Sequence, residues 1–85
     1  MTYSVVWSLF ALQTATALEA VVGDSQRIRA AQDRIDWALR RTPRDLGESR
    51  EPSFRLWYED VLGVYYHIDE TNLRVEVLYV GLSRR

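Results

Sequence analysis

The hydrophobic periodicity of the chain changes twice, and this order of patterns limits the folds that it can adopt. Residues 2–7 are rich in the β-branched and aromatic residues of a short strand. Two helical stripes of apolar residues follow, within 11–22 and 28–39. Three strand-like runs then complete the chain, at 54–58, 62–68 and 73–80. The predicted order is therefore strand, helix, helix, strand, strand, strand.

Capping and breaking residues set the predicted boundaries. Ser8 stands at an N-cap position and Gly23 at a helix end, while Asp24 can cap the second helix and Pro43 stops it. Residues 42–53 hold both prolines and show no periodicity, so we expect a loop there. The short separators between the other elements predict a helical hairpin and a β-meander.

These elements predict an α+β fold in which the helical hairpin packs on one face of a four-stranded, mainly antiparallel sheet. A length of 85 residues suits a single domain, 1–85. The chain has no cysteine and no histidine grouped with carboxylates at ligand spacing. We therefore expect no disulfide, no metal and no cofactor, and one core that supplies a stability of about 4 to 13 kcal/mol.

The first 22 residues are apolar enough to raise the question of a signal peptide or a membrane span. No basic residue precedes Arg27, and polar residues such as Gln13 and Glu19 interrupt the apolar run. We expect a cytoplasmic protein without a membrane partner.

Period-two alternation predicts which side chains of the sheet face the helices. If Val64, Tyr66 and Ile68 face inward, Tyr65 and His67 face outward. We likewise expect inward side chains at positions 54, 56 and 58 and at 75, 77 and 79. The open face would then present a mixed aromatic and charged set: Arg55, Trp57, Tyr65, His67, Arg74 and Glu76.

An open face of this kind has two interpretations. Aromatic side chains beside Arg can stack bases and hold phosphates, or anchor a protein interface. Alternatively, Trp57 and Tyr65 form a cross-strand pair that serves stability alone. His67 is the only histidine, and it suits either acid–base chemistry or a plain exposed strand position.

All 11 basic residues are Arg, within a chain of net charge −1. Arg27, Arg34 and Arg41 recur every seven residues and so share one stripe of the second predicted helix. The stripe is either a solvated face with ion pairs or a docking surface for an acidic partner or an RNA backbone.

Several strings, in this order and spacing, resemble the RelE/ParE superfamily of toxins from bacterial type II toxin–antitoxin modules, which includes plasmid stabilisation proteins. The similarity covers nearly the whole chain. It rests on residues 3–7 (YSVVW), 45–50 (DLGESR), 54–57 (FRLW), 63–69 (GVYYHID) and 75–81 (VEVLYVG).

The resemblance implies a toxin held inactive by a small, acidic antitoxin. Members of the RelE branch cleave mRNA on the ribosome, and members of the ParE branch inhibit DNA gyrase. Carried onto this sequence, Arg55 matches a basic position of the family and Arg84 can substitute for another after a small shift. Together with His67 from the open face, they are the candidate catalytic residues. The candidate RNA- or partner-binding residues are Trp57, Tyr65, Arg74, Arg27, Arg34 and Arg41.

The chain departs from the family where the chemistry would lie. Trp57, Gly63 and Ser83 stand where basic residues are expected. Two functions therefore stay open. One is a ribosome-dependent mRNA endoribonuclease that inhibits translation, and the other is a non-catalytic binding protein on the same fold, either a gyrase-type inhibitor or an inactive toxin homologue.

Overall fold

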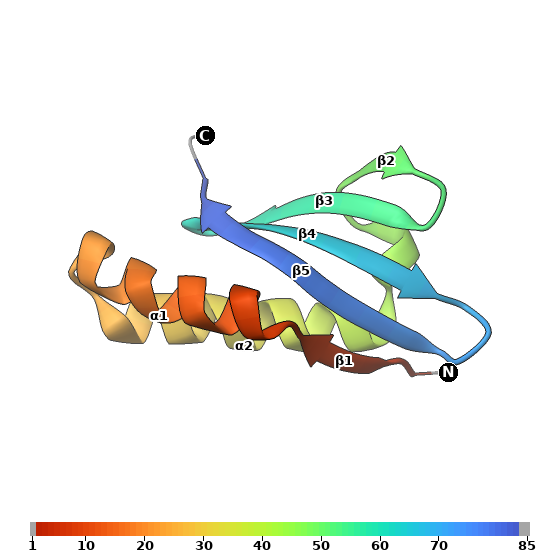
Figure 1. The fold of residues 1–85 in the computed structure, drawn as a ribbon, viewed down its shortest axis with the longest axis horizontal. Helices are drawn as coiled ribbons and strands as arrows, with labels where there is room; N and C mark the ends of the chain where they lie inside the picture. Colours follow the sequence, from red (N-terminus) through yellow and green to blue (C-terminus); the bar gives the residue numbers. More distant parts are fainter. Residues whose placement is uncertain (1, 84–85) are drawn as a thin grey trace.

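A computed structural model describes residues 2–83, in which two helices cover one face of a five-stranded sheet (Figure 1). The predicted α+β class and helical hairpin are confirmed. The elements are β1 (Ser4–Trp7), α1 (Leu9–Val22), α2 (Ser25–Arg41), a 3-10 turn (Pro43–Asp45), β2 (Glu48–Glu51), β3 (Phe54–Glu59), β4 (Leu62–Asp69) and β5 (Arg74–Leu82). No helix of residues 2–83 is long and apolar enough to cross a membrane.

The helix ends lie where the capping residues predict them. The Ser8 hydroxyl accepts a hydrogen bond from the amide of Ala11, and Gly23 closes α1 with a φ of 75°. The Asp24 carboxylate caps α2 by accepting from the amide of Arg27. These contacts satisfy backbone groups that a helix leaves unpaired at its ends.

The strand order is β1-β5-β4-β3-β2, so the first and last strands lie side by side (Figure 1). β1 runs parallel to β5, from Ser4 opposite Arg74 to Trp7 opposite Val77. The other neighbouring strands are antiparallel. The sheet is thus mainly antiparallel, as expected, with one parallel edge.

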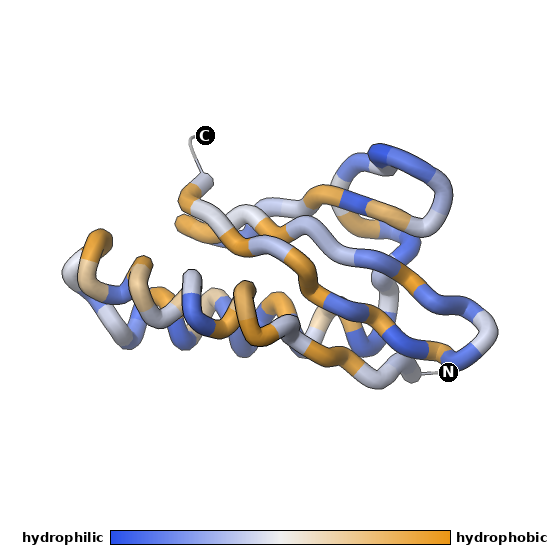
Figure 2. The backbone as a smooth tube through the Cα atoms, in the orientation of Figure 1, coloured by the Kyte–Doolittle hydropathy of each residue, from blue (hydrophilic) through white to orange (hydrophobic). Residues whose placement is uncertain are grey.

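The prediction of four strands and of a loop over 42–53 is wrong at Glu48–Glu51, which forms the edge strand β2. All four residues are exposed and hydrophilic (Figure 2), so the segment lacks the apolar alternation by which a strand is recognised. Gly47 leads into it with a φ of 64°, and a Cβ there would collide with the carbonyl oxygen of Leu56. Only glycine fits this position.

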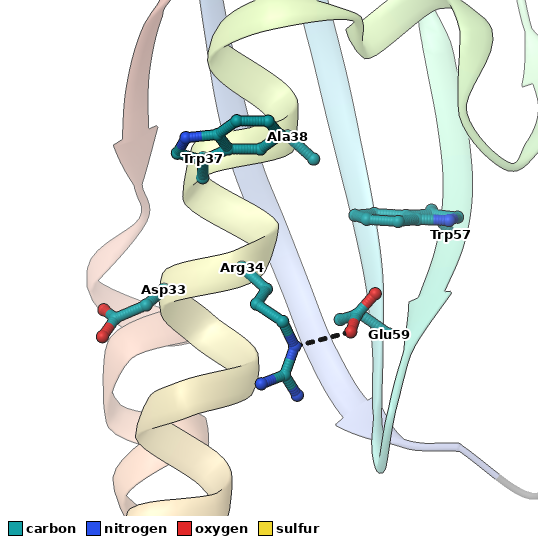
Figure 3. Close-up of a pocket in the computed structure, with 6 residues that line it drawn as sticks. All are labelled: Asp33, Arg34, Trp37, Ala38, Trp57 and Glu59. Carbon is teal, nitrogen blue, oxygen red and sulfur yellow. Dashed lines mark hydrogen bonds and ion pairs between the residues drawn. The ribbon is translucent and has the colours of Figure 1, made fainter.

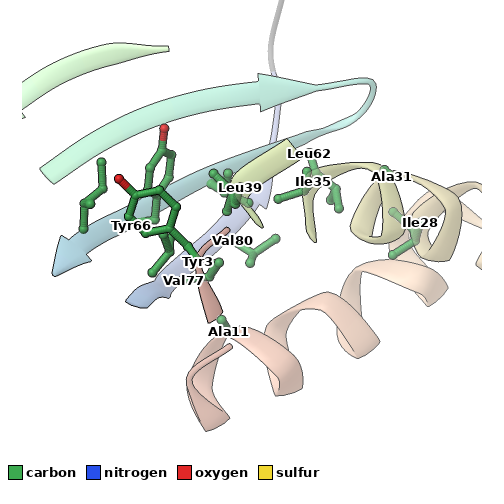
Figure 4. Close-up of a cluster of buried hydrophobic side chains, with 13 residues drawn as sticks. Tyr3, Ala11, Ile28, Ala31, Ile35, Leu39, Leu62, Tyr66, Val77 and Val80 are labelled. Carbon is green, nitrogen blue, oxygen red and sulfur yellow. The ribbon is translucent and has the colours of Figure 1, made fainter. Parts of the chain in front are cut away.

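The core lies between the helices and the sheet (Figure 4). Figure 4 labels residues from α1, α2, β4 and β5 within it. α2 contributes the fully buried Ile28, Ile35 and Leu39, whereas α1 buries only Ala11 and Ala15. The sheet contributes the side chains that were expected to face inward on β4 and the first half of β5, namely Val64, Tyr66, Ile68, Val75 and Val77.

The expected faces of β3 are reversed. In the β3–β4 ladder Arg55 lies opposite Tyr66, and Trp57 lies opposite Val64. Residues opposite each other share a face, so Arg55 and Trp57 point toward the helices. Their placement on the open face was wrong because only two residues, at 60 and 61, separate the paired ends of the hairpin. A shift of one residue turns every side chain to the other face.

The expected inward position of Tyr79 is also wrong. Tyr66 pairs with Val77 while Tyr65 pairs with Tyr79, so Leu78 is an extra residue in β5. This bulge resets the alternation. Tyr79 is consequently 56% exposed on the open face, and Val80 is buried.

Candidate functional site

The face of the sheet that points away from the helices carries a row of rings. His67 and Phe54 have ring centroids 4.7 Å apart, and Phe54 stacks on Tyr65 at 5.7 Å. The ring centroids of Tyr65 and Tyr79 lie 6.0 Å apart, and Tyr79 forms a T-shaped contact with Phe10 of α1 at 5.6 Å between centroids. The row therefore crosses β3, β4 and β5 and ends at the first turn of α1.

A small polar hollow of about 190 Å³ lies at the His67 end of the row. It is lined by two cross-strand pairs, His67 with Glu76 and Asp69 with Arg74. Hydrogen bonds from the side chain and backbone of Asn72 hold the pKa of Asp69 below its usual range. Two carboxyl groups beside one guanidinium give the hollow little attraction for an anion.

Arg55 lies on the opposite face of the sheet, which points toward the helices. Its Nε donates to the carbonyl of Leu46 at 2.7 Å, and its Nη2 donates to that of Gly47 at 3.2 Å. Tyr66, beside it, donates its hydroxyl to the carbonyl of Pro43 at 2.7 Å. Both side chains thus hold the segment between α2 and β2 against the sheet.

Trp57 lines an open cleft of about 420 Å³ between α2 and β3 (Figure 3). Figure 3 shows Trp37 of α2 and Trp57 of β3 on opposite sides of it. Arg34 donates from Nε to Oε1 of Glu59 at 2.7 Å, and this ion pair ties the helix to the end of β3. Trp57 also packs against the core and lies opposite Val64, so the alternative of a cross-strand pair with Tyr65 is wrong.

The Arg stripe on α2 is largely engaged within the chain. Arg27 forms a two-pronged contact with Asp60, with distances of 2.9 and 2.8 Å. The hydrogen bond from Arg27 holds the pKa of the Asp60 carboxyl below its usual range. Arg41 lies over the ring of Trp37, with its guanidinium carbon 4.1 Å from the centroid. The stripe fits the interpretation of a helix face with internal ion pairs.

The open face thus holds three of the candidate residues, namely Tyr65, His67 and Arg74. Arg55 and Trp57 lie on the opposite face, and Arg84 lies outside the described residues. The sequence did not indicate Phe54 and Tyr79 as open-face aromatics, nor Phe10 of α1 as the ring that meets Tyr79. A hairpin with a two-residue turn would have placed Phe54 correctly, but the bulge that exposes Tyr79 has no sequence signal here.

No protein family and no curated protein matches this sequence. The fold is similar to that in the crystal structure of the toxin–antitoxin complex RelBE2 from Mycobacterium tuberculosis. The TM-score is 0.79 at 22% identity, over 98% of this chain and 100% of that one. At this identity the likeness shows the fold alone. The chain therefore has a RelE-like fold, as the resemblance implied.

Proposed function

We propose that this chain is the toxin-like component of a toxin–antitoxin module and that it acts by binding other proteins. The RelE-like fold supports the first part, because the similar structure is a toxin–antitoxin complex. The observation that carries the second part is the scarcity of cations on the open face. Within the described parts of β3, β4 and β5, the pairing register puts one basic residue there, Arg74.

Cleavage of RNA builds negative charge on the scissile phosphate, and cations aimed at that charge stabilise it. Arg74 shares its hollow with Asp69 and Glu76, so its charge is largely offset. Gly63 offers no side chain, and Arg55 lies on the other face. A surface with so few cations would displace few counterions from a phosphate backbone, so it would gain little affinity for RNA.

The same face suits a protein partner better. Aromatic side chains are enriched among the residues that dominate interface energies, and charged residues are depleted at interface centres. The row of five rings gives such a centre, with the polar hollow at its rim. A small, acidic antitoxin is the partner that the fold likeness suggests.

The test is induced expression of the chain alone and together with the product of the adjacent gene, which the proposal requires to be a small acidic antitoxin. We expect growth to stop with the chain alone, with mRNA intact, and to resume when a complex of the two proteins forms. Normal growth of cells that express the chain alone, together with no complex, would refute the proposal.

A ribosome-dependent mRNA endoribonuclease is the second candidate, and the polar hollow is the observation that favours it. On this hypothesis His67 takes the proton of an attacking 2′-hydroxyl, the 2′-oxygen bonds to phosphorus as the bond to the 5′-oxygen breaks, and the 5′-oxygen leaves with a proton from water. Arg74 contacts the phosphate, although Asp69 and Glu76 offset its charge. Arg84 stays a candidate for the same role. On this hypothesis induced cells show cut mRNA, and His67→Ala abolishes the cuts while a complex with the antitoxin still forms.

A further inference from the structure

Two glycines face each other on the open side of the sheet, Gly63 in β4 and Gly81 in β5. Steric crowding explains why a glycine stands at position 63, because a Cβ there would lie 2.9 Å from Cε1 of the Tyr58 ring. No contact within the described chain explains why a glycine stands at position 81. Its φ lies outside the left-handed region, and a Cβ added to it meets nothing within 4 Å. Glycine inside a strand often marks a place where another molecule approaches the backbone.

A hollow of about 260 Å³ opens above these glycines. Tyr58, Tyr65 and Tyr79 contribute rings to its lining, together with Leu56. A closed cavity of about 150 Å³ suffices to bind benzene, so this space accommodates one ring or one branched aliphatic group. Gly81 lines this hollow, and a methyl group added to it would enter the space without meeting another atom within 4 Å.

We propose that this hollow binds one large apolar side chain, aromatic or branched aliphatic, carried by an extended segment of a protein partner. The inference rests on the proposed function, since it takes the open face as the surface for protein contacts. It adds the position of the anchor and the chemistry of the partner residue that fills it.

The lining favours a peptide over a nucleotide. None of the residues that line the hollow is charged, so a nucleotide would bring a phosphate with no cation to meet it. Tyrosine rings around an uncharged floor instead offer stacking and apolar contact to a neutral side chain.

The backbone beside the hollow supports an extended partner. β1 pairs with β5 only as far as Val77, and the Ser8 hydroxyl then donates a hydrogen bond to the carbonyl oxygen of Leu78. Among residues 2–83, no strand pairs with the outer edge of β5 beyond that point. An extended segment can therefore lie along this edge and place an alternate side chain over Gly81.

The first test uses small probes and needs no partner protein. We would titrate 15N-labelled protein with N-acetyltryptophanamide, N-acetylleucinamide and adenosine monophosphate and follow the amide signals by NMR. We expect the two apolar probes to shift the signals of Gly63 and Gly81, with millimolar dissociation constants. Shifts caused only by adenosine monophosphate would favour RNA and overturn the inference, as would the absence of shifts at both glycines.

The matched variants are Gly81→Ala and Glu76→Gln, both on the open side of β5. Gly81→Ala should keep its melting temperature and weaken binding of N-acetyltryptophanamide at least about tenfold, because its methyl group occupies the hollow. Glu76→Gln should bind as the wild type does. Tyr79→Ala removes one of the rings that line the hollow, so it should also weaken binding of N-acetyltryptophanamide. Equal binding by all four proteins would refute the proposed position.

The outcomes separate this inference from the function on which it rests. If the product of the adjacent gene binds wild type and Gly81→Ala equally well, the toxin–antitoxin role is supported and the hollow is not the anchor site of that partner. If the apolar probes bind at Gly81 but no complex with that protein forms, the anchor site is supported and the toxin–antitoxin role is refuted.

Discussion

Arg55 and Tyr66 lie opposite each other in the β3–β4 ladder, and both donate a hydrogen bond to the carbonyl oxygen of Leu46. The distances are 2.7 Å from Arg55 Nε and 3.3 Å from Tyr66 Oη. This shared acceptor fixes the chain between α2 and β2, which the sequence presents as an irregular loop. Arg55, a candidate for catalysis by resemblance, is therefore engaged in holding the fold together.

Arg55→Ala should lower the free energy of unfolding by about 1 to 2 kcal/mol, because the Leu46 carbonyl loses a charged donor. Urea denaturation measures the change. Arg50→Ala is the control, since its exposed pair with Glu48 should contribute less than about 1 kcal/mol. An Arg55→Ala protein as stable as the wild type would show that the contact has no structural role.

Tyr66→Phe should cost about 1 to 2 kcal/mol at neutral pH, because the carbonyl of Pro43 loses its buried donor. Burial raises the pKa of Tyr66 to about 12. The unfolded chain releases this proton near pH 10, so the contribution of Tyr66 is complete below that pH and is lost as the pH rises toward about 12. Urea midpoints should therefore converge for the two proteins in alkali, and a constant gap would contradict this assignment.

The contacts of Glu70 predict how the stability of the fold changes in acid. Its carboxylate accepts hydrogen bonds from Arg44 at 2.8 Å and from Tyr3 at 2.9 Å, and these contacts lower the pKa of Glu70. Stability from a lowered pKa is present above the unfolded value, near 4.3, and is lost as the pH falls through the folded value. The melting temperature of Glu70→Gln should lie below that of the wild type at pH 7 and approach it in acid. Parallel curves down to pH 3 would show that Glu70 does not cause the difference.

The bulge at Leu78 predicts opposite responses on either side of it. Val77→Asn buries an unpaired amide in the core and should cost more than about 3 kcal/mol. Tyr79→Asn changes an exposed residue and should cost about 1 kcal/mol through lost ring contacts. Chemical denaturation of both variants tests the register, and the reverse order would place Tyr79 in the core.

The fold was predictable from the sequence wherever one side of an element is buried. The stripe of Ile28, Ile35 and Leu39 and the alternation of Val64 and Tyr66 report the core directly. β2 was missed because pairing of its backbone requires no apolar residue on either face. The exposed strand leaves no periodic trace.

The candidate site was less predictable because one residue more or less in a turn or strand decides which face of the sheet each side chain occupies. With three residues in the β3–β4 turn, Arg55 and Trp57 would face outward, but the ladder closes from Glu59 to Leu62 and reverses them. The extra residue at Leu78 then brings Tyr79 out to join Tyr65. Hydropathy fits both registers of β3, since aromatic residues suit either face.

The pairing of β1 with β5 also determines when the protein can fold. Ser4 finds its partner Arg74 only after some seventy further residues have been synthesised, because β5 lies between β1 and β4. A nascent chain that lacks β5 can form the helical hairpin, but its first strand has no neighbour. Native contacts so distant in sequence slow folding, since a long loop must close before they form. The open face is therefore completed in one late step, together with the core beneath it.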